Sequence, residues 1–370
     1  MTRSVQVAVL ALLALPVLAT AQVPADLGEI RQKSSLTTND RTLLREYLQQ
    51  AVKAMLTNTD ADRRGMVAAR NNLLAEVQTA EGRTEAYRQA FAEEALAVLQ
   101  KAGDQAVSQP ARVNFVMVLA GLETLQAAPL LQSALVDDPY PASRYWAAKG
   151  LAMLAPKIVQ QVVPTLEREI ATAIEKALQK PHSPAVLMQL FAALGTFDHE
   201  KAHDILAAGV VDKAGGMDMS DPVVQKMVSD IVTALERVYS REVRPDAKKT
   251  MLLACATLCT HIMPPPPVPD EPPPAGYGRL MVQLNASLEK ITGEDVGFQS
   301  TESLAIQHLS MLEWVERLAR TKQIPRRPAM PAEVEEAVKQ REGGGGASGG
   351  AGGTAGENAP AVKAAADAGT

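Results

Sequence analysis

The sequence predicts an all-α protein built as an array of antiparallel helix pairs, on three observations. From about Thr38 to Leu318, apolar residues recur at every third or fourth position, which is the period of an amphipathic helix. Short polar breaks such as residues 58–62 separate helical segments of roughly 15–20 residues, which implies antiparallel neighbours. A segment that begins at Leu135 is matched 43 residues later by one that begins at Leu178. A repeat of this length is typical of stacked helical units.

The first 21 residues have the layout of a secretory signal peptide. Arg3 is followed by an apolar run of 13 residues, and the segment ends in Ala-Thr-Ala at Ala21. The run is shorter than the roughly 20 residues that a membrane-spanning helix needs. We therefore expect cleavage after residue 21, a secreted or periplasmic protein, and no membrane insertion after cleavage. Residues 22–37 are expected to form an N-terminal linker.

Three amphipathic helical faces follow this linker and open the array, which is expected to span residues 38–263. The three faces consist, in turn, of Leu43, Leu44, Tyr47, Leu48, Val52 and Met55, of Met66, Val67, Leu73, Leu74 and Val77, and of Tyr87, Phe91, Ala95, Val98 and Leu99. Each face places large apolar side chains on one side of a helix, which must then be buried against a neighbour.

Proline marks the helix starts in the middle of the array. Pro-Ala pairs at Pro110, Pro141 and Pro184 each precede an apolar helical pattern, and Pro222 begins a weaker copy. Proline suits the first position of a helix because its missing N–H has no intrahelical partner there. The predicted repeat unit is a helix, a short turn rich in Asp and Pro, and a second helix that begins at proline.

The segment over residues 128–154 reads Ala-Pro-Leu-Leu-Gln-Ser-Ala-Leu-Val-Asp-Asp-Pro-Tyr-Pro-Ala-Ser-Arg-Tyr-Trp-Ala-Ala-Lys-Gly-Leu-Ala-Met-Leu and resembles a HEAT repeat. The resemblance is clear over about residues 110–215 and looser to about residue 320, and it departs from the HEAT pattern in the long helical run at 163–178. It implies a right-handed α-solenoid. It also implies a scaffold without catalytic activity that binds a protein partner in the bacterial cell envelope, because stacked repeats leave long faces free for binding.

Composition divides the C-terminal part of the chain. The proline run over residues 264–275 lacks backbone donors, so it is expected to form an extended linker. A C-terminal helical segment at 276–320 and a linker with a charged helix at 321–342 are expected to follow. The tail, residues 343–370, is rich in Gly and Ala and has no aromatic residue, so we expect it to be disordered.

Charge and motif content exclude several functions. The chain has 37 Lys and Arg residues against 42 Asp and Glu, a net charge of -5, so it lacks the basic field that binds a phosphate backbone. Nucleic acid is therefore not an expected partner. The sequence contains no phosphate-binding loop, no nucleophile elbow and no strand-bound dinucleotide motif. No cofactor is expected.

One motif suggests an alternative, a zinc metallopeptidase. His199-Glu200-Lys201-Ala202-His203 resembles the H-E-x-x-H motif of zincin peptidases, in which the histidines hold zinc and the glutamate acts as base. The usual third ligand is not evident, since Asp221 lies in a turn and only Glu236 remains. The interpretation that we favour makes Asp198 the N-cap of an ordinary solvated repeat helix, with no metal bound.

The remaining candidates are aromatic and basic residues around one turn, and a pair of cysteines. Tyr140 is expected to be exposed, and Arg144 and Arg112 are candidates to line the same binding face, whereas Trp146 is expected in the core. Cys255 and Cys259 would share one helical face. A disulfide within one helix would be strained, so buried core thiols are expected there.

Overall fold

The computed structural model describes residues 27–56, 63–261, 276–293, 304–332 and 334–336, and this part of the chain is helical and contains no strand. The all-α prediction is therefore confirmed. The chain divides into two compact units, residues 1–329 and residues 330–370. The second unit is described only at residues 330–332 and 334–336, where Val334 is buried.

Several predicted segments lie outside the described residues. They are the signal peptide at 1–21, the proline-rich linker at 264–275, residues 337–341 of the charged helix, and the tail at 343–370. The expected N-terminal linker at 22–37 is described from residue 27 onward, where it contains a short helix with buried Leu27 and Ile30.

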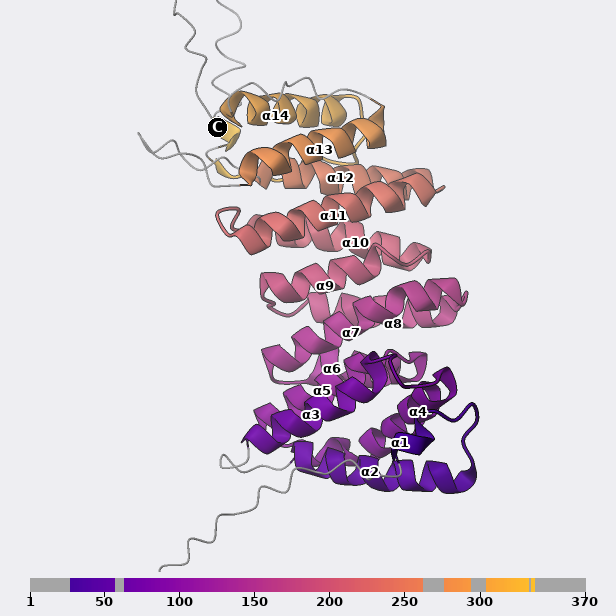
Figure 1. The fold of residues 1–370 in the computed structure, drawn as a ribbon. Coiled ribbons are helices and arrows are strands. Elements are labelled where there is room, and N and C mark those ends of the chain that lie inside the picture. The colour runs from indigo at the N-terminus through magenta and orange to yellow at the C-terminus, as the bar shows by residue number, and fades with distance from the viewer. Residues whose placement is uncertain (1–26, 57–62, 262–275, 294–303, 333, 337–370) are drawn as a thin grey trace, which may run out of the picture. The chain divides into compact units, whose positions relative to one another are not determined.

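The helices of the first unit follow one another in chain order (Figure 1). Their bounds are α1 (Leu27–Ile30), α2 (Thr38–Leu56), α3 (Arg63–Gln78), α4 (Glu85–Ala102), α5 (Gln109–Gly121), α6 (Ala128–Asp137), α7 (Pro141–Gln160), α8 (Pro164–Leu178), α9 (Pro184–Leu194), α10 (Glu200–Lys213), α11 (Pro222–Arg241), α12 (Pro245–His261), α13 (Tyr277–Thr292) and α14 (Leu304–Arg320). Short 3-10 turns η2 (Gly103–Gln105), η3 (Leu125–Ala127) and η4 (Ala214–Gly216) join some of them. In the described part of the chain, no helix is both long and apolar enough to cross a membrane.

Proline begins the central helices as the sequence predicts. Pro141, Pro184 and Pro222 are the first residues of α7, α9 and α11, and Pro110 is the second residue of α5. The run at 163–178, which departs from the HEAT pattern in sequence, forms α8, an ordinary amphipathic helix that also begins at proline. Its buried face is made of Ile170, Ala171, Ile174 and Ala177 among others.

The helices pack in two rows that run along the first unit. In the first row, α3, α5, α7, α9, α11 and α13 each contact the next, and in the second row α6, α8, α10, α12 and α14 do the same. Helices α2 and α4 also pack together, and most helices contact their partner in the other row. This arrangement buries a continuous apolar core between the rows, with Leu119, Leu151, Leu190 and Leu235 all fully buried.

Small residues allow the first row to pack closely. A Cβ atom on Gly150 of α7 would lie 2.8 Å from the Cβ of Ala120 on α5, and one on Gly195, after α9, would overlap Ala234 of α11. A larger side chain at either glycine would force the helices apart.

Candidate functional site

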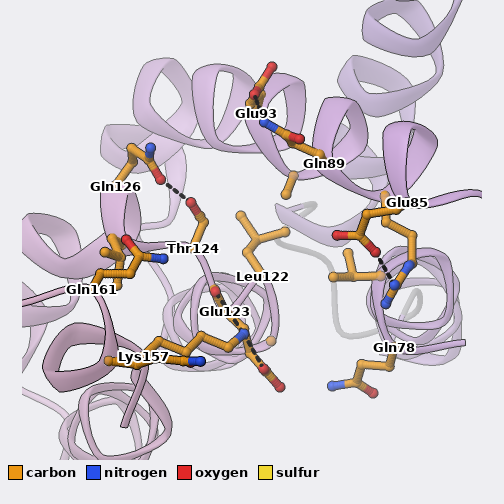
Figure 2. Close-up of a pocket in the computed structure, with 16 residues that line it drawn as sticks. Gln78, Glu85, Gln89, Glu93, Leu122, Glu123, Thr124, Gln126, Lys157 and Gln161 are labelled. Carbon is orange, nitrogen blue, oxygen red and sulfur yellow. Dashed lines mark hydrogen bonds and ion pairs between the residues drawn. The ribbon is translucent and has the colours of Figure 1, made fainter. Parts of the chain in front are cut away.

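A groove of about 720 Å³ opens beside α4, and we name it the polar groove (Figure 2). The end of α3, the face of α4, the turn between α5 and α6, and the end of α7 form its walls. The residues that line it are Val77, Gln78, Glu85, Arg88, Gln89, Ala92, Glu93, Gly121, Leu122, Glu123, Thr124, Leu125, Gln126, Lys157, Gln160 and Gln161.

The polar groove lies where the second row ends at α6 and is not continued by a close contact with α4. Helix α4 contacts α2, α3 and α5, but its contact with α6 is marginal at most, whereas α6, α8, α10, α12 and α14 each pack on the next helix. The space that a close α4–α6 contact would fill is left open at the turn over residues 122–127.

The turn that forms the groove wall is held in a strained conformation. Glu123 has a φ of 47°, in the left-handed region that residues other than glycine rarely adopt. The Nζ of Lys157 stabilises it by donating to the Glu123 carbonyl oxygen at 3.1 Å and to its Oε2 at 2.7 Å. Leu122, the preceding residue, is buried and anchors the turn in the core.

A second strained residue lies next to the polar groove. Val162 follows the lining residues Gln160 and Gln161, has a φ of 53° and is 78% exposed. The left-handed conformation is especially costly for a β-branched side chain, and such outliers cluster at functional sites. Two of the three left-handed residues other than glycine in the described chain therefore lie in this groove or beside it.

The walls of the polar groove offer hydrogen bonds rather than reactive groups. Their glutamines, Gln78, Gln89, Gln126, Gln160 and Gln161, each carry both a donor and an acceptor. The charged side chains are paired within the protein: Arg88 with Glu85, Lys157 with Glu123, and Glu93 with Arg41 and Gln89. Neither histidine nor cysteine lines the groove. Such a surface suits a hydrogen-bonded polypeptide segment better than covalent chemistry.

The H-E-x-x-H motif does not present two histidines on one helix. Helix α10 begins at Glu200, and His199 is its N-cap, whose Nδ1 accepts a hydrogen bond from the N–H of Lys201 at 3.1 Å. The prediction that Asp198 is the N-cap is wrong by one residue. Asp198 instead pairs with Arg241.

His203 is not part of a solvated helix start, so that expectation is wrong for this residue. Its side chain is buried, with Nδ1 2.9 Å from Oε2 of Glu242 and Nε2 3.2 Å from the carbonyl oxygen of Phe197. Both ring nitrogens therefore have partners within the protein. Glu200 lies 3.6 Å from Arg244 in an ion pair.

The two acidic residues considered as a third metal ligand also have other partners. Asp221 caps α11 by accepting the N–H of Val223, and Glu236 binds Ser287 and Lys290. Among the residues that the structure describes, no three of the His, Cys, Asp and Glu side chains are gathered as a metal site.

Glu242, which sequence reasoning missed, organises the surroundings of His203. Its carboxylate is buried and accepts the backbone N–H of Val243 and of Arg244, each at 2.9 Å, as well as the Arg244 guanidinium. The hydrogen bonds from Arg244 hold the pKa of the Glu242 carboxyl well below its usual range, against the effect of burial. A Glu-x-Arg-Pro sequence, whose proline begins α12, is the local signal of this turn.

The structure brings Arg112, Arg144 and Tyr140 together around the buried residue Asp138. Arg112 Nε donates to Oδ2 of Asp138 at 3.0 Å, the Tyr140 N–H donates to its Oδ1 at 2.9 Å, and Arg144 donates to its carbonyl oxygen at 3.0 Å. Tyr140 is half-buried. These residues hold the turn between α6 and α7.

Trp146 is half-buried, so the prediction that it belongs to the core is wrong. Its ring makes an edge-to-face contact with Tyr145, at 5.6 Å between centroids, and the Nζ of Lys149 lies 4.5 Å from its centroid. The lysine lies three residues further along α7, so this cation–π contact is formed within one helix.

The cysteines lie in the core as free thiols. Cys255 and Cys259 are both buried on α12. Burial raises the pKa of Cys255 to about 12 and that of Cys259 well above its usual value. These thiols are therefore chemically quiet in the folded chain.

No family model, curated protein or solved structure matches this chain. Its function must therefore be inferred from its own geometry, and the polar groove is the most distinctive feature of that geometry.

Proposed function

We propose that the protein is an exported helical-repeat scaffold of the cell envelope that binds a protein partner through the polar groove. Its fold would be a right-handed α-solenoid of HEAT-like helix pairs. The layout of residues 1–21 supports export. The packing of successive helices in two rows supports the repeat architecture.

The single observation that carries this proposal is the polar groove itself. It is open and is lined by glutamines and by charges that are already paired, so it can exchange hydrogen bonds with a peptide backbone without burying an unpaired charge. The exposed Val162 beside the groove offers an apolar contact for one side chain of the partner. Catalysis has no comparable support here.

Site-specific photocrosslinking in intact cells tests this proposal. A photoreactive amino acid replaces Gln89 or Gln126, whose side chains face the groove, and the control position is Gln50, which is exposed on α2 outside it. We expect one crosslinked species from both groove positions and none from the control. Thr124→Trp should fill the groove and abolish the crosslink, whereas Thr42→Trp on the exposed face of α2 should not. A crosslink that survives Thr124→Trp, or that forms equally at Gln50, would contradict the proposal.

The zinc peptidase alternative has no such support, because both ring nitrogens of His203 bind protein groups. It remains directly testable. Metal analysis of the mature chain, purified without chelator, beside His203→Ala, should give no zinc in either protein. One equivalent of zinc that the variant loses would favour the peptidase and overturn the scaffold proposal.

A further inference from the structure

A second, smaller pocket lies away from the polar groove, between the turn joining α8 to α9 and the turn joining α10 to α11. Its volume is about 230 Å³, and we name it the Lys180 pocket. The residues that line it are Lys180, Pro181, His182, Pro184, Leu187, Lys213, Gly216, Met217, Val224 and Met227.

The floor of the Lys180 pocket is apolar. Leu187 from α9 and Val224 and Met227 from α11 are buried in the core, and the half-buried Met217 adds a flexible wall. Methionine adapts to ligands of different shape because its side chain is unbranched and polarizable. The volume is of the size of one aliphatic side chain and a few attached atoms.

The rim of the Lys180 pocket is cationic, in a chain whose net charge is -5. Lys180 and Lys213 line it from opposite turns. The half-buried His182 also lines the pocket, with its Nε2 2.7 Å from the carbonyl oxygen of Ala177. Burial lowers the pKa of His182, against the hydrogen bond to Ala177, and the positive charges of Arg144, Lys213 and Lys180 lower it further. Lys180 and Lys213 are the two permanently cationic side chains among the residues that line the pocket.

Lys180 and Lys213 each keep hydrogen-bond donors that could bind a ligand. Lys180 donates to the carbonyl oxygen of Val136, and Lys213 pairs with its neighbour Asp212, but an ammonium group has three donors. The other acidic side chains of the α10–α11 turn are occupied, since Asp218 accepts from Ser220 and Asp221 caps α11.

We propose that the Lys180 pocket binds the C-terminal residue of a protein partner, with an aliphatic side chain on the floor and the terminal carboxylate between Lys180 and Lys213. The inference deepens the proposed function, on which it rests for the nature of the partner. A terminal residue such as leucine combines an aliphatic side chain and a carboxylate on adjoining atoms. Internal Asp or Glu residues carry the carboxylate without the aliphatic branch, so they match only half of the pocket. Capture of a terminal carboxylate is a recurrent mode of peptide recognition.

Methionine methyl NMR tests the proposal on the full chain. Met217 and Met227 line the pocket and report directly on its occupancy. The probes are N-acetyl-Gly-Gly-Leu as the free acid and the same peptide as the C-terminal amide. We expect the acid to shift both methyl signals in a saturable way, and the amide to bind at least about tenfold more weakly because it lacks the charge.

Two single variants and a control sharpen the test. Lys180→Gln and Lys213→Gln should each weaken binding of the acid about tenfold while keeping the apolar floor. Lys226→Gln removes an exposed lysine of α11 that does not line the pocket, and it should leave the affinity unchanged.

Three results would overturn the inference. One is equal binding of acid and amide, or the absence of any shift of the two methyl signals at millimolar peptide. Another is equal binding of N-acetyl-Gly-Glu-Gly amide, which would indicate an internal acidic residue. The third is equal binding of 4-methylpentanoate, which would indicate a free carboxylic acid rather than a polypeptide. Because these probes are defined peptides, failure here is distinguishable from failure of the crosslinking at the polar groove.

Discussion

Two junctions in the second row of helices show how this protein is closed in one place and open in another. Between α8 and α10 the helices pack directly, and the carboxylate of Glu167 on α8 accepts the N–H groups of Asp198 and His199 at 2.8 and 2.9 Å. Between α4 and α6 the polar groove intervenes. There α4 presents Glu85, whose side chain is 76% exposed and pairs with Arg88 on its own helix.

Contacts from the first row do not explain this difference, because a first-row helix binds the turn before α6 as well as the turn before α10. Lys157 of α7 binds Glu123 in the open junction, and Arg241 of α11 binds Asp198 and the carbonyl oxygen of Gly195 in the closed one. The closed junction has two further connections, the buried carboxylate of Glu167 and the ion pair of Glu175 on α8 with Lys201 on α10 at 3.2 Å. Of these two, only Glu167 is buried and reaches the backbone of the turn before α10, so we take it as the side chain that accompanies closure.

The largest expected loss of stability comes from removing the buried carboxylate of Glu242, which lies just before α12. Glu242→Ala leaves Arg244, His203 and two backbone N–H groups without their shared acceptor, so the free energy of unfolding should fall by about 3–5 kcal/mol. Urea denaturation measures this. Asp246→Ala, at an exposed residue of α12, is the control and should change stability by less than about 0.5 kcal/mol. A loss below about 1 kcal/mol for Glu242→Ala would show that the network carries little stability.

A smaller loss is expected when the link across the closed junction is removed. Glu167→Ala removes a buried carboxylate that accepts two backbone N–H hydrogen bonds and should cost about 2–3 kcal/mol. Amide hydrogen exchange should also accelerate over residues 196–200 toward the rate at the groove turn over residues 122–127. The exposed Glu169 on the same helix provides the control, Glu169→Ala. Unchanged exchange in Glu167→Ala would rule out this carboxylate as the reason for closure.

Acid should remove the stability contributed by two buried carboxylates, Glu242 and Asp40. The pKa of Glu242 lies well below its usual value, and hydrogen bonds from Lys33 and Thr37 lower that of Asp40 to about 2. The unfolded chain therefore takes up protons first as the pH falls, and the stability that these groups contribute above about pH 5 is lost on the way down. We expect a loss on the order of 1–2 kcal/mol between about pH 5 and pH 3. Glu242→Ala should flatten this pH profile, and an identical slope in the variant would contradict the assignment.

The smallest expected change in stability is a gain, and it concerns Val162 beside the open junction. Val162→Asn replaces a strained β-branched residue by one that tolerates the left-handed region, so stability should rise by about 0.5–1 kcal/mol. Thermal unfolding measures the gain, and Val107→Asn, at an exposed valine without positive φ, should not reproduce it. A gain in both variants would indicate a general surface effect. We also expect Val162→Asn to reduce crosslinking at Gln126 because it removes the apolar contact beside the groove.

Local features of the fold could be predicted from the sequence. The periodic apolar faces and the prolines at Pro141, Pro184 and Pro222 place helices correctly because a helix start depends on residues only a few positions apart.

The site could not be predicted, because it depends on how helices far apart in sequence are placed. The contact of His203 with Glu242 joins residues 39 positions apart, and the H-E-x-x-H spacing says nothing about it. The polar groove arises from a missing helix contact, which leaves no pattern of its own in the chain. Arg112 and Arg144 both bind Asp138, which lies 26 residues after Arg112, and the sequence carries no signal of this shared partner.

The two buried thiols of α12 can be used to detect opening of the folded chain. Only a thiolate reacts with an alkylating reagent, and burial keeps Cys255 and Cys259 both protonated and inaccessible. Alkylation of either cysteine therefore reports an opening in which α12 left its neighbours. In an oxidising compartment, these thiols are oxidised only after the chain opens. The unfolding rate, rather than the redox potential of the surroundings, therefore sets how long the chain stays reduced.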